Sequence, residues 1–161
     1  MVAAILNKMI GYFGQDAKRI NHALKVYGFA RAIAGGESVS GRQGTILELA
    51  AILHDIGIKE AERKYNSSSG KYQELEGPPI AAAFLAEAGV DAAVSDRVCY
   101  LVGNHHSYGK IDGVDFQILV EADFIVNIFE DSMDIEAVKS IKNKYFRTAA
   151  GVRMLENLYN V

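Results

Sequence analysis

Residues 46–57 of the chain read ILELAAILHDIG, an apolar segment that ends in two chemically active side chains, His54 and Asp55. The apolar residues follow the three-to-four-residue spacing of a helix, and Gly57 marks the end of that helix. A carboxylate at the end of an apolar helix is costly to bury without a partner. The position of Asp55 therefore predicts a cation, or several hydrogen-bond donors, beside it in the folded chain.

The helical spacing of apolar residues extends over almost the whole chain, and no segment shows the alternation of a strand. Asp16 has the side chain of an N-cap, Gly35 is a stop signal, and Pro78 suits the first turn of a helix. We expect helices over residues 1–13, 16–34, 45–57, 78–89, 91–105, 115–129, 135–145 and 148–159. The sequence predicts an all-α helical bundle of about seven or eight helices, in a single domain over residues 1–161.

Residues 59–77 form the one long connection between these expected helices. They are rich in charged side chains, serine and glycine. We expect a polar surface loop, part of which extends the preceding helix. Long loops of this kind often carry function.

Composition excludes several classes of protein. The chain has 161 residues, of which 50% are apolar, and its formal net charge is −3. A mildly acidic chain lacks the basic surface that a nucleic-acid polymer needs, so we expect no such partner. No apolar run reaches the ~18 residues of a membrane span, so we expect no membrane association. The single cysteine, Cys99, allows no intrachain disulfide and suits a reducing cytoplasm, where we expect the protein.

Asp123 is a second carboxylate in an apolar setting, because residues 118–126 read ILVEADFIV and the aspartate shares a helix face with apolar neighbours. Imidazole nitrogens and carboxylate oxygens are ligands for divalent transition metals. Helices of a bundle can aim such side chains at one central point, and a metal there would neutralise both carboxylates. Three separate helices contribute four candidate ligands: His22, His54, Asp55 and Asp123.

This set of residues resembles the HD superfamily of metal-dependent phosphohydrolases, which is named for its His-Asp doublet. The string LHDIG at residues 53–57 is similar to the core motif of the family, and His22 and Asp123 occur at similar spacings before and after it. Arg19 and the string EAD at residues 121–123 also look like the family. The resemblance covers about residues 16–130.

The resemblance implies an all-helical fold around a central metal site and hydrolysis of a phosphate ester, such as a nucleotide or a related small phosphorylated metabolite. It implies that His22, His54, Asp55 and Asp123 bind a divalent metal, which is Mn, Fe, Co, Ni, Zn or Mg. Members of the family with two metals carry further histidines, and their aspartate at the position of Asp55 bridges the ions.

The later two of those further histidines match His105 and His106, but no histidine lies between Asp55 and His105. Glu76 lies in that gap and is the candidate to replace the missing ligand at a possible second site. The alternative is that Glu76 stabilises the N-terminus of the helix that begins at Pro78.

The implied mechanism needs a nucleophile and positive donors. A bound divalent ion lowers the pKa of its water towards ~7 and polarises a phosphoryl oxygen. Donors must hold the remaining phosphate oxygens, over which charge is spread. We expect the catalytic residues to be Asp55, Lys59 and His105. The other candidate donors are Arg19, Arg63, Lys71, Asn104 and His106.

Two other functions stay open at this point. One is a di-iron oxygenase on the same helical scaffold, with His22, His54, Asp55, His105, Asp123 and either Glu76 or a water as ligands. The other is a non-catalytic module that binds a ligand and keeps only the fold. The presence of all four core ligand types argues against the second.

Overall fold

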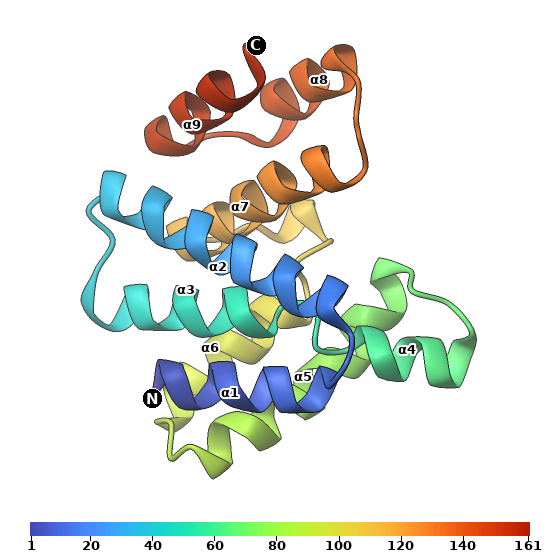
Figure 1. Cartoon of the computed structure of the whole chain (residues 1–161). Helices are drawn as coiled ribbons and strands as arrows, with labels where there is room; N and C mark the ends of the chain where they lie inside the picture. Colours follow the sequence, from blue (N-terminus) through green and yellow to red (C-terminus); the bar gives the residue numbers. More distant parts are fainter.

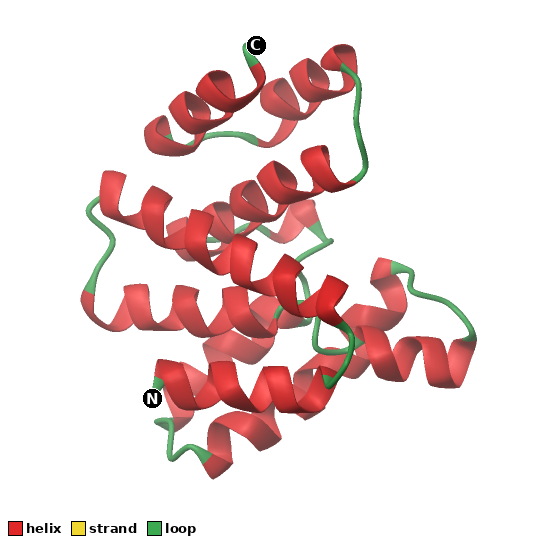
Figure 2. Ribbon diagram, viewed as in Figure 1, coloured by secondary structure: helices red, strands yellow, loops and turns green.

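The computed structural model describes residues 1–161 and contains nine α-helices, one short 3-10 helix and no strand (Figures 1 and 2). The elements in order are α1 (Val2–Phe13), α2 (Ala17–Gly36), α3 (Gly41–Leu53), α4 (Ile58–Tyr65), α5 (Gly70–Glu87), α6 (Ala92–Val102), η1 (Tyr108–Lys110), α7 (Val114–Glu130), α8 (Ile135–Tyr145) and α9 (Ala149–Tyr159). The prediction of an all-α bundle is confirmed. None of the helices has the length and apolar character needed to cross a bilayer.

Helices α2, α3 and α7 form the centre of the bundle, because each of them packs against the other two. Helix α1 covers α3 on one side, and α8 and α9 cover α7 on the other (Figure 1). One cluster of 34 buried apolar residues runs through these contacts. From Ile46 to Leu53, every residue of α3 except Glu48 is buried. His54 and Asp55, which follow this helix, therefore lie in the middle of the molecule.

The structure corrects the expected loop over residues 59–77. Most of this segment is helical, because α4 and the first part of α5 occupy it and only residues 66–69 lie between them. Helix α5 also continues through Pro78 rather than beginning there. Polar and aromatic contacts hold this segment together: Tyr65 stacks on Tyr72 with ring centroids 4.1 Å apart. The spacing of apolar residues reveals these helices poorly, because Ala61 is the only buried residue of α4 and the first part of α5 is mostly polar.

Helix α4 packs against α5, α5 packs against α6, and the connection between α4 and α5 projects to one side (Figure 1). A Cβ atom added at Gly57 would lie 2.4 Å from the carbonyl oxygen of Gln73 and 2.5 Å from the nitrogen of Gly77. Both contacts are with backbone, which cannot move aside as a side chain can. Glycine at position 57 therefore lets α5 cross directly over the turn that carries Asp55.

Replacing this glycine tests the crossing. Gly57→Ala should destabilise the fold by about 1–3 kcal/mol, because the new methyl group overpacks a backbone contact. The matched control is Gly28→Ala, at an exposed position inside α2 where nothing lies within 4 Å of the added Cβ. The control should leave stability unchanged or raise it by up to about 1 kcal/mol. Urea unfolding of both variants measures the difference, and equal midpoints would contradict this description of the crossing.

Candidate metal centre

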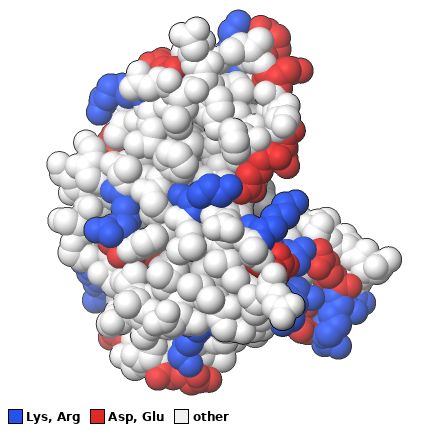
Figure 3. Space-filling model, viewed as in Figure 1, with Lys and Arg blue, Asp and Glu red and all other residues white.

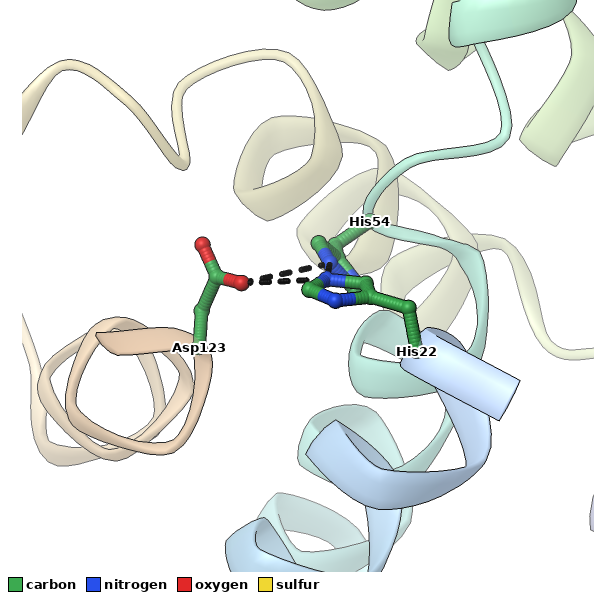
Figure 4. Close-up of side chains that lie close together, drawn as sticks. All are labelled: His22, His54 and Asp123. Atoms are coloured by element: carbon green, nitrogen blue, oxygen red, sulfur yellow. Dashed lines mark hydrogen bonds and ion pairs between the residues drawn. The ribbon is translucent and has the colours of Figure 1, made fainter. Parts of the chain in front are cut away.

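Side chains from four parts of the bundle meet in its interior. His22 comes from the first half of α2, His54 and Asp55 follow the end of α3, and Asp123 lies in the middle of α7. His105 lies in the turn after α6. His54 and His105 are only 1% and 2% exposed. In the close-up, the side chains of His22, His54 and Asp123 point toward one another from three different helices or helix ends (Figure 4).

The first cluster consists of His22, His54 and Asp123. The two Nε2 atoms of the histidines are 3.1 Å apart, and Oδ1 of Asp123 lies 3.2 Å from the first and 3.7 Å from the second. Donor atoms that each lie ~2.0–2.2 Å from one ion are separated from each other by about 3 to 3.6 Å. The spacing of these atoms therefore fits a shared divalent ion.

The second cluster consists of Asp55, His105 and His106. Oδ1 of Asp55 lies 3.3 Å from Nε2 of His105. The other carboxylate oxygen, Oδ2, lies 3.5 Å from Nε2 of both His22 and His54. Asp55 thus stands between the two clusters, with one oxygen facing each.

The hydrogen bonds behind the rings fix which nitrogen of each histidine faces the cluster. Nδ1 of His54 donates to the carbonyl oxygen of Ala51, and Nδ1 of His105 donates to that of Val102, each over 2.8 Å. Nδ1 of His22 donates to Oε2 of Glu130 over 2.9 Å. A carbonyl or carboxylate oxygen can only accept, so in the neutral rings the proton sits on Nδ1 and the Nε2 lone pair faces inward.

One of these inward nitrogens has no hydrogen-bond partner at all. Nε2 of His105 is buried and makes no hydrogen bond, although Oδ1 of Asp55 lies 3.3 Å from it. Burial would lower the pKa of His105, but the neighbouring Asp55 raises it above its ordinary value. Buried polar atoms without a partner are rare in folded proteins. An orphaned lone pair beside a carboxylate, in a set of imidazole and carboxylate donors, fits a divalent transition metal. The clusters therefore could hold a metal ion.

The protonation of the metal-free site follows from these contacts. Burial alone would lower the pKa of His22, but the hydrogen bond with Asp123 and the charges of Asp123 and Asp55 raise it to about 9. Burial lowers the pKa of His54 and lowers that of His106 to about 4. The pKa of Asp55 lies below its ordinary value in spite of burial, because the imidazoles face it. Without a metal, a proton on His22 partly balances the two carboxylates.

A cavity of about 460 Å³ opens beside both clusters. Figure 3 shows a notch between the projecting α4–α5 segment and the rest of the molecule, with acidic and basic side chains at its edge. Ile58 is the only apolar residue in its wall, so the cavity suits a polar ligand. It is lined by Lys18, Arg19, His22, Asp55, Ile58, Glu62, Ser68, Gln73, His106, Asp123, Asn127, Glu130 and Asp131.

The structure does not bring two of the expected site residues to the cavity. Nζ of Lys59 donates to the carbonyl oxygen of Tyr12 over 2.9 Å and lies over the ring of that tyrosine. The carboxylate of Glu76 accepts hydrogen bonds from Lys64 and Tyr65, and Glu76 belongs to neither cluster. Both residues lie in segment 59–77, for which the sequence predicts a polar surface loop. Helices α4 and α5 instead direct these two side chains elsewhere.

Arg19 is the only one of the expected phosphate-binding cations that lines the cavity. One guanidinium nitrogen lies 2.6 Å from Asp16, which caps the same helix, and the other lies 2.5 Å from Glu62 on α4. Lys18 lies beside it, exposed and with no ion pair. The positive charge of the cavity therefore comes from the first turn of α2 rather than from Lys59.

Three residues that the sequence did not single out contact the clusters. Nδ2 of Asn127 donates to Oδ1 of Asp123 over 2.9 Å, Glu130 accepts from His22, and Oε1 of Gln73 lies 3.5 Å from Nε2 of His106. Positions 123, 127 and 130 follow the spacing of one helix face. That spacing is a signal that could have identified Asn127 and Glu130 once Asp123 was singled out, whereas nothing in the sequence points to Gln73.

Comparisons with known proteins identify a family and a similar fold. The family model of the HD domain matches residues 19–142 of the chain. A solved structure from an uncultured Thermotogales bacterium, described as a predicted HD superfamily hydrolase, has a similar fold. The TM-score is 0.71 at 23% sequence identity, over 97% of this chain and 83% of the other. No match was found among curated proteins.

The raised pKa of His22 predicts how the stability of the metal-free protein depends on pH. The folded-state pKa of about 9 lies above the ordinary value, so the stabilisation is complete below about pH 6.5 and is lost as the pH rises through 9. We expect the free energy of unfolding to fall by on the order of 3 kcal/mol between these limits. The measurement is urea unfolding of chelator-treated protein from pH 6 to pH 10. His22→Asn should remove most of this slope, and an equal slope in the variant would contradict the assignment.

Proposed function

Because this chain belongs to the HD-domain family, we propose that it is a metal-dependent phosphohydrolase that acts on a small phosphate ester, such as a nucleotide or a related phosphorylated metabolite. Six residues would hold divalent ions in two clusters. His22, His54 and Asp123 belong to the first cluster, and His105 and His106 belong to the second. Asp55 belongs to the second and faces the first as well.

The observation that carries this proposal is the position of Asp55. Its Oδ2 faces His22 and His54, while its Oδ1 faces His105. A carboxylate placed in this way can serve two ions at once, which is the arrangement used to hold both the attacking and the leaving oxygen in phosphate-ester hydrolysis. The imidazole-rich donor set favours Mn, Fe, Co, Ni or Zn over Mg.

A divalent ion held by these residues would supply a nucleophilic water at neutral pH and would polarise a phosphoryl oxygen. The protein contributes the shape and charge of the cavity beside them. Arg19 and Lys18 offer positive donors for phosphate oxygens, because both line the cavity wall at the first turn of α2. An arriving phosphate must compete with Glu62 for Arg19, since these two side chains are paired.

The polar wall of the cavity supports a small and highly polar substrate. Only Ile58 is apolar among the lining residues, so no apolar surface is available there for a long hydrocarbon chain. The volume of about 460 Å³ is within the ordinary range for small-molecule sites. A phosphorylated metabolite matches both properties better than a polymer does.

Substitution of the ligands tests the proposed reaction. The wild-type protein, stripped of metal and reconstituted with Mn²⁺, Co²⁺ or Ni²⁺, should release phosphate from a panel of phosphate monoesters. His22→Ala and Asp55→Asn should each lower kcat at least about a hundred-fold, because each removes a donor from a metal cluster. A wild-type protein that binds these ions but releases no phosphate from any ester would contradict the hydrolase proposal. Oxygen consumption by the iron-loaded protein would instead support the oxygenase alternative.

Substitution of the cations tests which of them hold the phosphate. Arg19→Ala should raise KM by about ten-fold or more, because a charge-assisted hydrogen bond to the phosphate is lost. Lys59→Ala is the matched control, because it removes a positive charge that lies outside the cavity and contacts Tyr12. Steady-state kinetics on the same ester should leave KM of the control unchanged. A larger effect at Lys59 than at Arg19 would contradict the role given to the cavity wall.

A further inference from the structure

His22 is held differently from the other two histidines whose Nδ1 atoms point away from the clusters. His54 and His105 each donate to a backbone carbonyl three residues earlier in the chain, which is a local and neutral contact. His22 donates instead to the carboxylate of Glu130, 108 residues away on another helix. One histidine of the three therefore has a charged partner, and that partner comes from α7, which also carries Asp123.

Glu130 is itself fixed at both oxygens. Oε2 accepts from Nδ1 of His22, and Oε1 accepts from Nζ of Lys25. His22 and Lys25 lie three residues apart on one face of α2, so the two donors reach the same carboxylate from neighbouring turns. The side chain of Glu130 is only 18% exposed. These contacts join α2 to the end of α7 and fix the orientation of the Glu130 carboxylate.

The place of Glu130 in its helix is unfavourable on local grounds. It is the last residue of α7, where the partial negative charge of the helix terminus repels a carboxylate, and no basic residue lies in the last turn to offset this. Local rules are most often broken at functional sites, where another interaction provides the compensation. The contacts with His22 and Lys25 are the compensation seen here.

A carboxylate behind a metal-binding imidazole has known consequences. It fixes the tautomer, orients the ring and makes the inward nitrogen a stronger donor to the metal. In this protein the inward nitrogen is Nε2 of His22, which lies 3.2 Å from Asp123 and 3.1 Å from His54. Any change at Glu130 would thus reach the first cluster and leave the backbone-held His105 of the second cluster untouched.

We propose that Glu130 is a positioning residue that sets the metal affinity of the cluster formed by His22, His54 and Asp123, and that Lys25 holds Glu130 in place. This inference rests on the proposed metal centre, but it does not depend on which reaction takes place there. It assigns a role to an ion pair that lies outside the candidate ligands.

Metal binding measured without any substrate tests the proposal. Metal-depleted full-length protein is titrated with Co²⁺, and both the heat of binding and the visible absorption of the bound ion are recorded. Glu130→Ala should weaken the affinity for one ion by about ten- to a hundred-fold, because the orienting partner of His22 is lost. Glu130→Gln should weaken it less, since an amide oxygen still accepts from Nδ1. Lys25→Met should have a smaller effect in the same direction.

The matched control is Asp131→Asn, which removes one negative charge from the next residue in the chain. Asp131 lines the same cavity but makes no contact with His22. The Co²⁺ affinity of Asp131→Asn should equal that of the wild type. If the loss of any negative charge near the cavity weakened metal binding, this variant would bind Co²⁺ less tightly as well. A thermal unfolding curve of each metal-free variant shows whether it is folded. If Glu130→Ala does not fold, the Co²⁺ affinities of Glu130→Gln and Lys25→Met are compared with that of the wild type instead.

Two results would overturn the proposal. One is a Glu130→Ala protein that binds Co²⁺ as tightly as the wild type, with the same absorption spectrum. The other is a loss of affinity in Asp131→Asn as large as that in Glu130→Ala. A wild-type protein that binds no Co²⁺ would refute the metal centre itself together with this inference. A protein that binds Co²⁺ but hydrolyses no ester would refute only the proposed reaction.

Discussion

The structure depends on two carboxylates at the centre of the bundle, a buried Asp123 and a partly buried Asp55 at the cavity wall, which face a group of imidazoles. Asp55 and Asp123 lie inside an apolar bundle, and removing such charges from water is costly unless an opposite charge is near. The three inward Nε2 atoms cannot supply that charge while their rings are neutral. A proton on His22 offsets part of it in the metal-free protein. A divalent cation would offset the negative charge more completely. The carboxylates that lower the stability of the metal-free fold are therefore also well suited to bind a metal.

The surrounding helices hold these groups where they must be. Helix α3 is buried along most of its length, so its end places His54 and Asp55 at the centre of the bundle. Helix α5 crosses the turn after them at Gly57, where a side chain would not fit. Helices α2 and α7 supply the remaining side chains of the first cluster, and the hydrogen bond between Glu130 and His22 joins the two helices. The polar cavity lies where these helices meet the α4–α5 segment, which gives a substrate access to groups that are otherwise deeply buried.

The sequence predicted the helical class from the apolar period. It predicted the convergence of His22, His54, Asp55 and Asp123 from two carboxylates in apolar helices and from the joint spacing of all four residues, which resembles the HD family. The apolar period identifies the central helices, and a carboxylate within such a period is conspicuous. It did not predict α4, since that helix is short and Ala61 is its only buried residue. The sequence also did not show that Lys59 contacts Tyr12 and that Glu76 contacts Lys64 and Tyr65, because the direction of a side chain cannot be read before its helix is recognised. Glu130 was missed although it shares a helix face with Asp123, because the ion pair that explains it joins residues far apart in the chain.

The central claim is that the two clusters hold two divalent ions with Asp55 between them. Crystals grown with Mn²⁺ and measured near the manganese absorption edge test it most directly, because anomalous scattering locates the ions without any assumption about activity. The account predicts two anomalous peaks, one within bonding distance of His22, His54 and Asp123 and the other within bonding distance of His105, with a different oxygen of Asp55 on each. A map with no anomalous peak at these residues, or with Asp123 turned toward solvent, would contradict it.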